Sequence, residues 1–377
     1  MRTIIDIHVL QTVPPSNINR DDTGSPKTAT YGGTRRARVS SQAWKRATRD
    51  TFASTVDKSQ LGVRTKRVVE LLTERITELA PDYAERAAEL ATATLTATGI
   101  KLKTARKKDA PDESGYLLFL SHAQVSALAE LAISTAQAAG DDPIRIDKKA
   151  AKARADQDHS IDVALFGRMV ADDTDLNVDA AAQVAHALSV HEAATEYDYY
   201  TAVDDHKRDD TEEDAGAGMI GTVEFTSATL YRYATVDANR LQDNLGDTAA
   251  TRQAVQAFVR AFVTSMPTGK QNTFANRTLP EAVLVIVRDT QSINLVGAFE
   301  EAITDRDKGS RLSAAVGRLV DYGRDLHTAY DEQPVAAWSV GIGDRSNELS
   351  ELGQRTSFDT LVTSVDTVVG ERLAGTP

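Results

Sequence analysis

The sequence lacks cysteine altogether, so disulfides, thiolate nucleophiles and zinc ribbons are excluded. Its seven histidines show no HExxH or HxH spacing, and no GxxxxGKS/T loop is present, so we expect neither a metal nor a cofactor. Long apolar runs are also missing, because the longest, residues 282–287, is far too short to span a bilayer. Asp6 and His8 interrupt the region where a signal peptide would be apolar, so we expect a cytoplasmic protein with no membrane partner.

Positive charge is scarce overall but concentrated near the N-terminus. The 377 residues contain 43 Lys and Arg against 55 Asp and Glu, a net charge of −12. Residues 1–49 carry nine Lys or Arg and three Asp, a local balance of +6 that leaves about −18 for the remainder. Positive charge focused on an acidic body favours a polyanion that is bound at one site and repelled elsewhere.

The densest basic stretch is YGGTRRARVSSQAWKRATR, residues 31–49. It has no acidic side chain and six cations: Arg35, Arg36, Arg38, Lys45, Arg46 and Arg49. Ser40 or Ser41 can cap a helix that begins near Gln42, and the N–H groups of a helix N-terminus attract phosphate. The last three cations would lie on neighbouring turns behind that site. The alternative is a solvated basic helix face without a ligand.

The pattern along the chain predicts an α+β protein with a large helical insertion. Residues 3–13 are rich in β-branched residues and predict a buried strand, followed by an irregular loop that carries Arg20 and Lys27. Alanine-rich amphipathic patterns predict helices at residues 67–79, 82–97, 123–139, 148–156 and 178–195. Further strands are expected at 222–236, 282–288 and 336–342, and further helices at 237–264, 313–330 and 358–369, with Asp237 and Ser313 as caps. This order resembles an elaborated ferredoxin-like or RNA-recognition-motif core whose sheet is interrupted by the helical lobe.

Three further segments contain candidate nucleic-acid contacts. Residues 160–166 predict a strand before a turn, after which Arg168 could bind phosphate and Met169 could separate bases. Tyr199 and Tyr200 begin a protruding, charged hairpin or loop and could stack on bases. A loop shaped by proline and glycine presents a polar, cationic tip suited to phosphate, made of Lys270, Gln271, Asn272 and Thr273. Core packing is the alternative for Met169 and for both tyrosines.

Several of these segments together resemble one known family. The segments NRDDTGSPKTATYGGTRRARVSSQAWKRATR, DVALFGRM, YYTAVDD, GTVEFTSATLYRY and PTGKQNTFAN occur in the order found in the backbone subunit of type I-E Cascade, the CRISPR RNA-guided surveillance complex. The similarity covers essentially the full length. On these motifs the sequence is identified as a member of the CasC family.

The resemblance implies a hand-shaped protein. An RNA-recognition-motif palm would comprise residues 1–61 and 222–377, a helical fingers insertion residues 62–196, and a hairpin thumb residues 197–221. Copies would stack head to tail along the CRISPR guide RNA, and each thumb would displace one nucleotide so that a target DNA strand pairs in short segments. The expected partners are the guide RNA, the target DNA strand, neighbouring copies and other Cascade subunits. Family members of this type are scaffolds without nuclease activity, so no catalytic residue is expected.

The family motifs also imply which residues contact RNA. In the palm these are Arg20, Lys27, Arg38, Ser40, Gln42, Lys45, Arg46 and Arg49, with Lys270, Gln271 and Thr273 completing the backbone track. Near the displaced nucleotide they are Arg168 and Met169, and at the root of the thumb Tyr199, Tyr200 and Thr201. The thumb segment is longer and more acidic than the family pattern, with Met219 where a polar, ring-bearing residue can occur. We expect residues 203–218 to be mobile without RNA.

Two expectations depend on exposure and burial. Exposed charges contribute little to stability, so replacing Lys45, Arg46 and Arg49 together by glutamate should prevent guide loading and leave the fold intact.

The competing hypothesis is an RNA-processing endoribonuclease, because RNA-recognition-motif palms also host such enzymes and His8, Asp21 or Asp22 could act on a 2′-hydroxyl. Against it, we expect His8 to be a core histidine and the two aspartates to anchor arginines.

Overall fold

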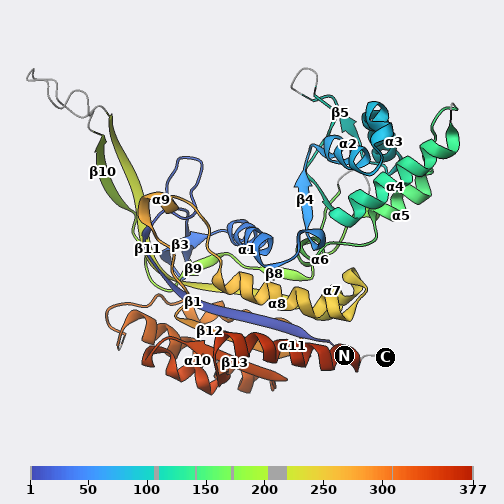
Figure 1. The fold of residues 1–377 in the computed structure, drawn as a ribbon. Coiled ribbons are helices and arrows are strands. Elements are labelled where there is room, and N and C mark those ends of the chain that lie inside the picture. Colours follow the sequence, from blue (N-terminus) through green and yellow to red (C-terminus); the bar gives the residue numbers. More distant parts are fainter. Residues whose placement is uncertain are drawn as a thin grey trace, which may run out of the picture.

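A large mixed sheet forms the base of the molecule (Figure 1). The computed structural model describes residues 2–105, 110–140, 142–170, 174–202, 219–307 and 309–375. In these residues the strand order is β14-β13-β12-β1-β11-β9-β3-β2, and β8 and β10 also pair with β11. The strands are β1 (Ile4–Ser16), β2 (Thr28–Tyr31), β3 (Thr34–Val39), β8 (Ala182–Val184), β9 (Ala187–Ser189), β10 (Glu196–Ala202), β11 (Met219–Asp237), β12 (Ala282–Arg288), β13 (Ala336–Gly341) and β14 (Gln354–Arg355).

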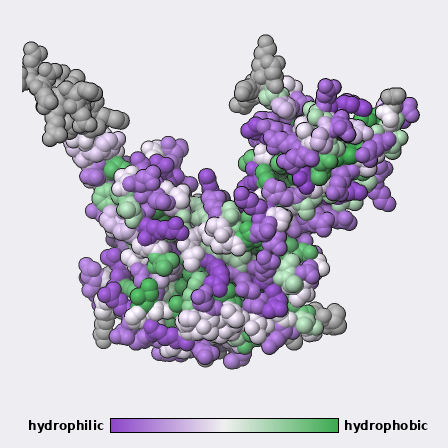
Figure 2. Space-filling model, in the orientation of Figure 1, coloured by the Kyte–Doolittle hydropathy of each residue, from purple (hydrophilic) through white to green (hydrophobic). Residues whose placement is uncertain are grey.

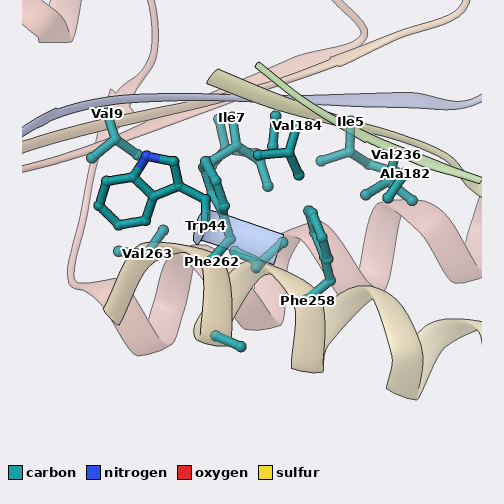
Figure 3. Close-up of a cluster of buried hydrophobic side chains, with 14 of the residues drawn as sticks. Ile5, Ile7, Val9, Trp44, Ala182, Val184, Val236, Phe258, Phe262 and Val263 are labelled. Atoms are coloured by element: carbon teal, nitrogen blue, oxygen red, sulfur yellow. The ribbon is translucent and has the colours of Figure 1, made fainter. Parts of the chain in front are cut away.

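The central strand β1 is buried on both faces and joins two cores. Ile5, Ile7 and Val9 point to one face, where Figure 3 shows them near Trp44 and Phe262. The alternate side chains, such as Leu10, belong to a second cluster on the other face, because side chains of a strand alternate. The first core includes residues of α1 (Ser41–Thr55), α6 (Ile161–Phe166), α7 (Ala238–Leu245), α8 (Thr248–Thr264) and α11 (Phe358–Ala374), and the second includes α10 (Arg311–Ala329).

A helical lobe with its own core stands above the sheet (Figure 1). Its buried leucines include Leu72, Leu90 and Leu128. The lobe contains α2 (Val68–Leu79), α3 (Ala87–Ala97), α4 (His122–Ala139) and α5 (Lys148–Ala155). Two short ladders accompany these helices: β4 (Gly62–Thr65) pairs with β7 (Leu118–Ser121), and β5 (Leu102–Lys103) pairs with β6 (Glu113–Ser114).

A two-stranded arm projects from the opposite end of the sheet (Figure 1). It consists of β10 paired antiparallel with the first residues of β11. The predicted thumb lies in this arm, but residues 203–218, for which mobility was expected, lie outside the described residues. The expected α+β class is confirmed, and the finer description of the sheet as an RNA-recognition motif stays a prediction.

The helix predicted at residues 178–195 is wrong. Here β8 and β9 pair with β11, and β9 also pairs with β3. Ala182 and Ala187 are buried between the sheet and the helices. Alanine favours helices, but pairing with β11 satisfies the backbone and buries this segment, so tertiary contacts override the local propensity. Residues 182–189, expected in the insertion, therefore belong to the large sheet.

Two further predictions are also wrong. Residues 161–166 form the helix α6 and not a strand, and the helix ends at Gly167, whose φ is 78°. So short a run cannot distinguish the two periods, and residues 161–165 are all buried. Ile161, Ala164 and Leu165 pack in the main core, whereas Val163 packs in a separate cluster. The helix predicted at 237–264 is divided into α7 and α8 by Gly246, which adopts a φ of 70°.

Helix caps follow the sequence more closely. Asp237 accepts a hydrogen bond from the Arg240 N–H at 3.1 Å, which confirms it as the cap of α7. At α10, however, Ser310 is the cap, and Ser313 donates its N–H to it at 3.3 Å. Both serines have the chemistry of a cap, so the sequence alone left the start of α10 uncertain by one turn.

Burial lowers the pKa of three histidines, to about 3 for His8 and to about 4 for His159 and His191. The Nδ1 atom of His8 lies 2.9 Å from the Tyr231 hydroxyl. His191 Nε2 accepts the Thr229 N–H at 3.1 Å. These rings are neutral in the folded protein at neutral pH, since a buried charge without a counterion is costly.

We expect the His191→Gln variant to depend less on pH than the wild type between pH 6.5 and 4. In this window an unfolded histidine, with its ordinary pKa of 6.5, binds a proton that the folded ring does not, so acid favours unfolding. Urea unfolding at pH 7, 6 and 5 gives the free energy of unfolding at each pH. The slope of this free energy against pH should differ between the two proteins by the equivalent of about one bound proton. Burial raises the pKa of Asp6, which acts in the opposite direction, so the comparison of the two proteins isolates the histidine. Equal pH dependence would contradict this assignment.

Candidate nucleic-acid interface

Helix α1 begins at a capped N-terminus that is tied to a neighbouring loop. Ser40 Oγ accepts the Ala43 N–H at 3.3 Å, which confirms the predicted cap. The Ser40 N–H donates to the Asn19 side chain at 2.8 Å, so the start of the helix is fixed to the loop of residues 17–27. The helix buries Trp44 and leaves Arg46 exposed. One helix therefore anchors in the core and presents cations outward.

A groove of about 990 Å³ lies between α1 and the helical lobe. Figure 2 shows the open space between the arm and the lobe, with both hydrophilic and hydrophobic residues on its floor. From α1 the groove is lined by Gln42, Lys45, Arg46, Arg49 and Asp50. The other side is lined by Arg64, Tyr116, Leu117, Phe119 and residues 166–169 and 177–180.

Gln42, Lys45 and Arg46 give the groove a polar strip along α1. The Arg46 side chain is 85% exposed and lies 3.7 Å from Asp50, a surface ion pair of little energetic value. The Lys45 ammonium lies 5.8 Å from the centroid of the Phe166 ring, and burial lowers its pKa. Because neither cation is held by a buried acid, a phosphate can approach both.

Arg49 does not have the expected exposure. Its Nε and Nη2 atoms lie 3.3 Å from the Asp162 carboxylate, which is 4% exposed. Its guanidinium also lies 4.5 Å from the centroid of the Phe119 ring. The expectation that all three α1 cations can be reversed without cost to the fold is therefore wrong for Arg49, which joins α1 to α6 and β7.

Arg168 and Met169 are neighbours with opposite environments. The Arg168 side chain is 1% exposed; it donates to the Leu176 carbonyl at 2.7 Å and lies 3.3 Å from Asp156. This guanidinium holds the loop after α6 and is not turned to a phosphate in this conformation. Met169 is 80% exposed, which excludes the alternative that it fills the core. An exposed methionine at the groove suits an apolar wedge.

Two loops that carry predicted phosphate contacts are held together at the root of the arm. Asn17 is buried, and its Nδ2 donates to the carbonyls of Gly24 and Glu224, both at 3.0 Å. Gly269 approaches so closely that a Cβ there would lie 2.4 Å from the Ile18 carbonyl oxygen. The loop of residues 17–27, the arm and the loop of residues 266–275 thus form one unit.

The predicted contacts on these loops differ in accessibility. Exposed side chains are Arg20, Gln271 and Thr273, and partly buried ones are Lys27, Arg38 and Lys270. Arg38 Nε donates to the Thr28 carbonyl at 3.2 Å, and its Nη1 lies 3.3 Å from His186 Nδ1. Lys270 adopts a φ of 50° at the start of the short helix α9 (Gln271–Phe274). None of these residues lines the groove; the loop of residues 17–27 is tied to the start of α1 through Asn19 and to the loop of residues 266–275 through Gly269.

The tyrosines of the arm do not share one face. Along β10, Tyr197, Tyr199 and Thr201 point to one side and Tyr200 to the other. Tyr197, Tyr199 and Tyr200 are 68%, 62% and 43% exposed, so core packing does not account for them. Tyr200 lies over its cross-strand partner Gly221, where a Cβ would lie 2.4 Å from the ring. A single strand of nucleic acid on one face of the arm would therefore meet Tyr199 or Tyr200, but not both.

The predicted contacts thus fall into three groups. The groove contains Gln42, Lys45, Arg46, Arg49, Arg168 and Met169; the two loops, with β3 and the cap of α1, contain Arg20, Lys27, Arg38, Ser40, Lys270, Gln271 and Thr273; and the arm contains Tyr199, Tyr200 and Thr201. Arg64 and Phe119 also line the groove and were missed. They face each other across β4 and β7, and strands of four residues give little periodic signal.

Two of the three residues considered for nuclease chemistry, His8 and Asp21, occupy structural positions, and Asp22 is exposed. His8 is fully buried, as expected of a core histidine. Asp21 accepts the N–H groups of Thr23 and Ser25 at 3.0 Å each, so it shapes a turn, and the expected arginine anchor is not found among the described residues. The described residues contain no group of three or more His, Asp or Glu placed to hold a metal. Nor does that part of the chain contain a helix long and apolar enough to cross a membrane.

Comparison with known proteins identifies the family. A family model described as CT1975-like protein matches residues 5–364. The chain belongs to this family. Two similar solved chains come from structures titled "CRISPR RNA-guided surveillance complex, pre-nicking" and "CRISPR RNA-guided surveillance complex". The first is 36% identical with a TM-score of 0.84 and covers 97% of this chain and 100% of its own; the second is 30% identical with a TM-score of 0.74 and covers 97% and 99%.

The search of curated proteins gave no significant match. The matches confirm the expected relationship to Cascade backbone proteins, whereas the type I-E subtype stays a prediction.

Arg49→Glu is expected to lower the free energy of unfolding by about 3 kcal/mol or more. The substitution removes the partner of a buried carboxylate and places a second negative charge beside it. The matched control is Arg46→Glu on the same helix, which should change stability by about 0.5 kcal/mol or less. Urea unfolding measures both variants. Equal stability of the two proteins would show that the Arg49 ion pair does not support the fold.

Proposed function

We propose that this protein is a non-catalytic scaffold that binds the CRISPR guide RNA in a type I-E Cascade-type surveillance complex. Copies polymerise along the guide, hold its phosphates and present it in segments to a target DNA strand in antiviral defence. The sheet serves as an RNA-recognition-motif-like palm (residues 1–61 and 222–377, together with residues 182–189 of β8 and β9), the lobe as fingers (62–181) and the arm as thumb (197–221). The titles of the two similar structures name CRISPR RNA-guided surveillance complexes, which supports this function.

The observation that carries the proposal is the groove beside α1. It combines the accessible cations Lys45 and Arg46 with Met169, an apolar side chain that is 80% exposed. Phosphate needs the cations, and a base displaced from its neighbours needs an apolar surface in place of the lost stacking. A metabolite pocket would instead be enclosed and would converge a few polar groups on one point.

Charge distribution agrees with an elongated polyanion as the ligand. The chain as a whole carries −12, whereas residues 1–49 carry +6. Contacts to phosphate are independent of base sequence, so recognition of a target is left to base pairing with the guide. A subunit that holds any guide needs cations and a wedge but no residue that reads bases.

The backbone track proposed from the sequence is kept with three changes of role. Arg20, Lys27, Arg38, Gln42, Lys45, Arg46, Lys270, Gln271 and Thr273 contact phosphates directly, and Ser40, which is buried, caps the helix beside them. Arg49 and Arg168 support the track, because their guanidinium groups are held by Asp162 and by the Leu176 carbonyl. Met169 acts as the wedge, with Tyr199, Tyr200 and Thr201 on the arm of the same or a neighbouring copy.

Head-to-tail contact between copies needs two different complementary surfaces on one chain. The basic N-terminal region and the acidic remainder offer such a pair.

The double variant Lys45→Glu with Arg46→Glu should lose most of the RNA that copurifies with the wild type, because it reverses two accessible charges in the groove. The matched control is Lys148→Glu with Lys149→Glu, two exposed lysines at the start of α5 that do not line the groove. The absorbance ratio at 260 and 280 nm and gel shifts with single-stranded RNA measure the loss. Equal RNA retention in both double variants would overturn the proposed function.

Incubation with repeat RNA, with and without magnesium, separates the scaffold from the competing endoribonuclease. We expect the RNA to stay intact, since His8 is buried and Asp21 holds a turn. Cleavage that depends on the protein would favour the enzyme.

Met169→Ala should leave guide binding within about threefold but abolish periodic distortion of the bound RNA. The reason is that a wedge acts on base stacking, whereas affinity comes from phosphate contacts. The control is Leu79→Ala, which truncates another exposed apolar residue of the lobe outside the groove. Chemical probing of the bound guide should give regularly spaced reactive nucleotides in the wild type and control and a flat profile in Met169→Ala. Unchanged spacing in Met169→Ala would exclude the wedge.

A further inference from the structure

Arg64 projects into the groove from the helical lobe. It pairs with Phe119 across β4 and β7, and cross-strand partners point to the same face of a sheet. That face is turned to α1, because the Phe119 ring lies 4.5 Å from the Arg49 guanidinium. Arg64 is exposed and lines the groove opposite Lys45 and Arg46.

The position of Arg64 is fixed by the junction at Asp162. The Asp162 carboxylate accepts the Gly62 N–H at 2.9 Å and the two Arg49 bonds at 3.3 Å. Gly62 leaves no room for adjustment, since a Cβ there would lie 2.8 Å from the Phe119 ring. β4 is thus held against α1 at the residue two positions before Arg64.

Most charged groups in the groove have an opposite charge within 4.0 Å, although the Arg46–Asp50 pair is exposed and leaves Arg46 accessible. Arg46 pairs with Asp50 at 3.7 Å, Arg49 with Asp162 at 3.3 Å, Arg168 with Asp156 at 3.3 Å, and Asp179 with Arg240 at 2.9 Å. Within the described residues, Lys45 and Arg64 are the groove cations with no carboxylate within 4.0 Å. Two positive charges that face the same groove repel each other, which costs free energy unless an anion lies between them.

We propose that Arg64 is a further phosphate-binding residue, which holds the backbone of the guide RNA from the wall opposite α1. This inference rests on the proposed function and extends it, because it makes the helical lobe a direct part of the RNA-binding surface. A guanidinium presents planar donors that match a phosphate, and Arg64 has no described partner to compete for them. Lys45 and Arg64 contact the same strand, since both line a single groove.

Arg64→Gln should weaken binding of a short, unstructured single-stranded RNA by about three- to tenfold near 0.1 M salt. The decisive measurement is the slope of log affinity against log salt concentration, taken by fluorescence anisotropy. For a single strand, loss of one phosphate contact lowers the magnitude of this slope by about 0.7. If Arg64 had only a structural role, its replacement would not change the slope in this way. Arg64→Lys keeps the charge and should keep the wild-type slope.

The matched control is Arg67→Gln, which removes the same charge three residues along. Arg67 is exposed, pairs with Glu70 and does not line the groove, so its slope should stay at the wild-type value. Thermal unfolding of both variants should match the wild type. Arg64→Gln could lose slope only because it unfolds more easily, which a lower unfolding midpoint would show. In that case Arg64→Lys is compared with it, and a wild-type salt slope in Arg64→Lys beside a reduced slope in Arg64→Gln supports the proposal.

Three results would overturn the inference. The first is an equal slope in Arg64→Gln and Arg67→Gln, and the second is an equal loss of slope in Arg64→Lys and Arg64→Gln. The third is a defect confined to pairing of target DNA with an unchanged RNA slope, which would place Arg64 on the second strand. If the Lys45→Glu and Arg46→Glu double variant loses RNA in the same assay, only the role of Arg64 fails; if it also retains RNA, the proposed function fails.

Discussion

The groove depends on the ion pair between Arg49 and Asp162. Trp44 anchors α1 in the core of the sheet, and Arg49 extends from the same helix to a carboxylate that is 4% exposed. That carboxylate also accepts the Gly62 N–H, at the entrance to the helical lobe, and the Ser160 hydroxyl at 2.7 Å. A buried carboxylate is tolerated only when such partners satisfy it, so sheet, lobe and α6 keep one arrangement. The two walls of the groove are positioned by this arrangement.

Local patterns predicted the elements whose contacts are local. The β-branched run in β1, the Ser40 cap and the amphipathic helices α2 and α4 are confirmed within a few residues. The failures at residues 161–166 and 178–195 are segments whose state is decided by distant partners: β8 and β9 pair with β11, whereas α6 packs into the main core with residues of α7 and α8. Alanine-rich and apolar stretches of this length fit both the helical and the strand period. The pairing of β8 and β9 with β11 joins residues about fifty positions apart, so the segment itself does not encode it.

The motifs selected several residues that the structure brings together, but not the environment of each one. Gln42, Lys45, Arg46 and Met169, which the motifs proposed as RNA contacts, line one groove. Nothing in the sequence separates Arg168 from the accessible cations Lys45 and Arg46. Its side chain is nevertheless buried against Leu176 and Asp156. Arg64 was missed for the converse reason, because it lies in a four-residue strand outside the basic stretch. Burial of a single arginine depends on the packing of elements far away in sequence, which spacing cannot reveal.

Some arginines of the basic stretch, residues 31–49, support the fold and do not add free charge to the surface. Arg36 is fully buried and donates to the carbonyls of Ser189, Phe299 and Glu300 at 2.9 to 3.0 Å, and Arg49 is neutralised by Asp162. The +6 balance of residues 1–49 therefore overstates the charge that an anion meets. In the proposed scaffold, a groove with few free cations would bind each segment of RNA weakly, but copies that share one strand would multiply their affinities. Modest charge per copy is thus compatible with the proposed scaffold, in which occupancy comes from the number of copies on the guide.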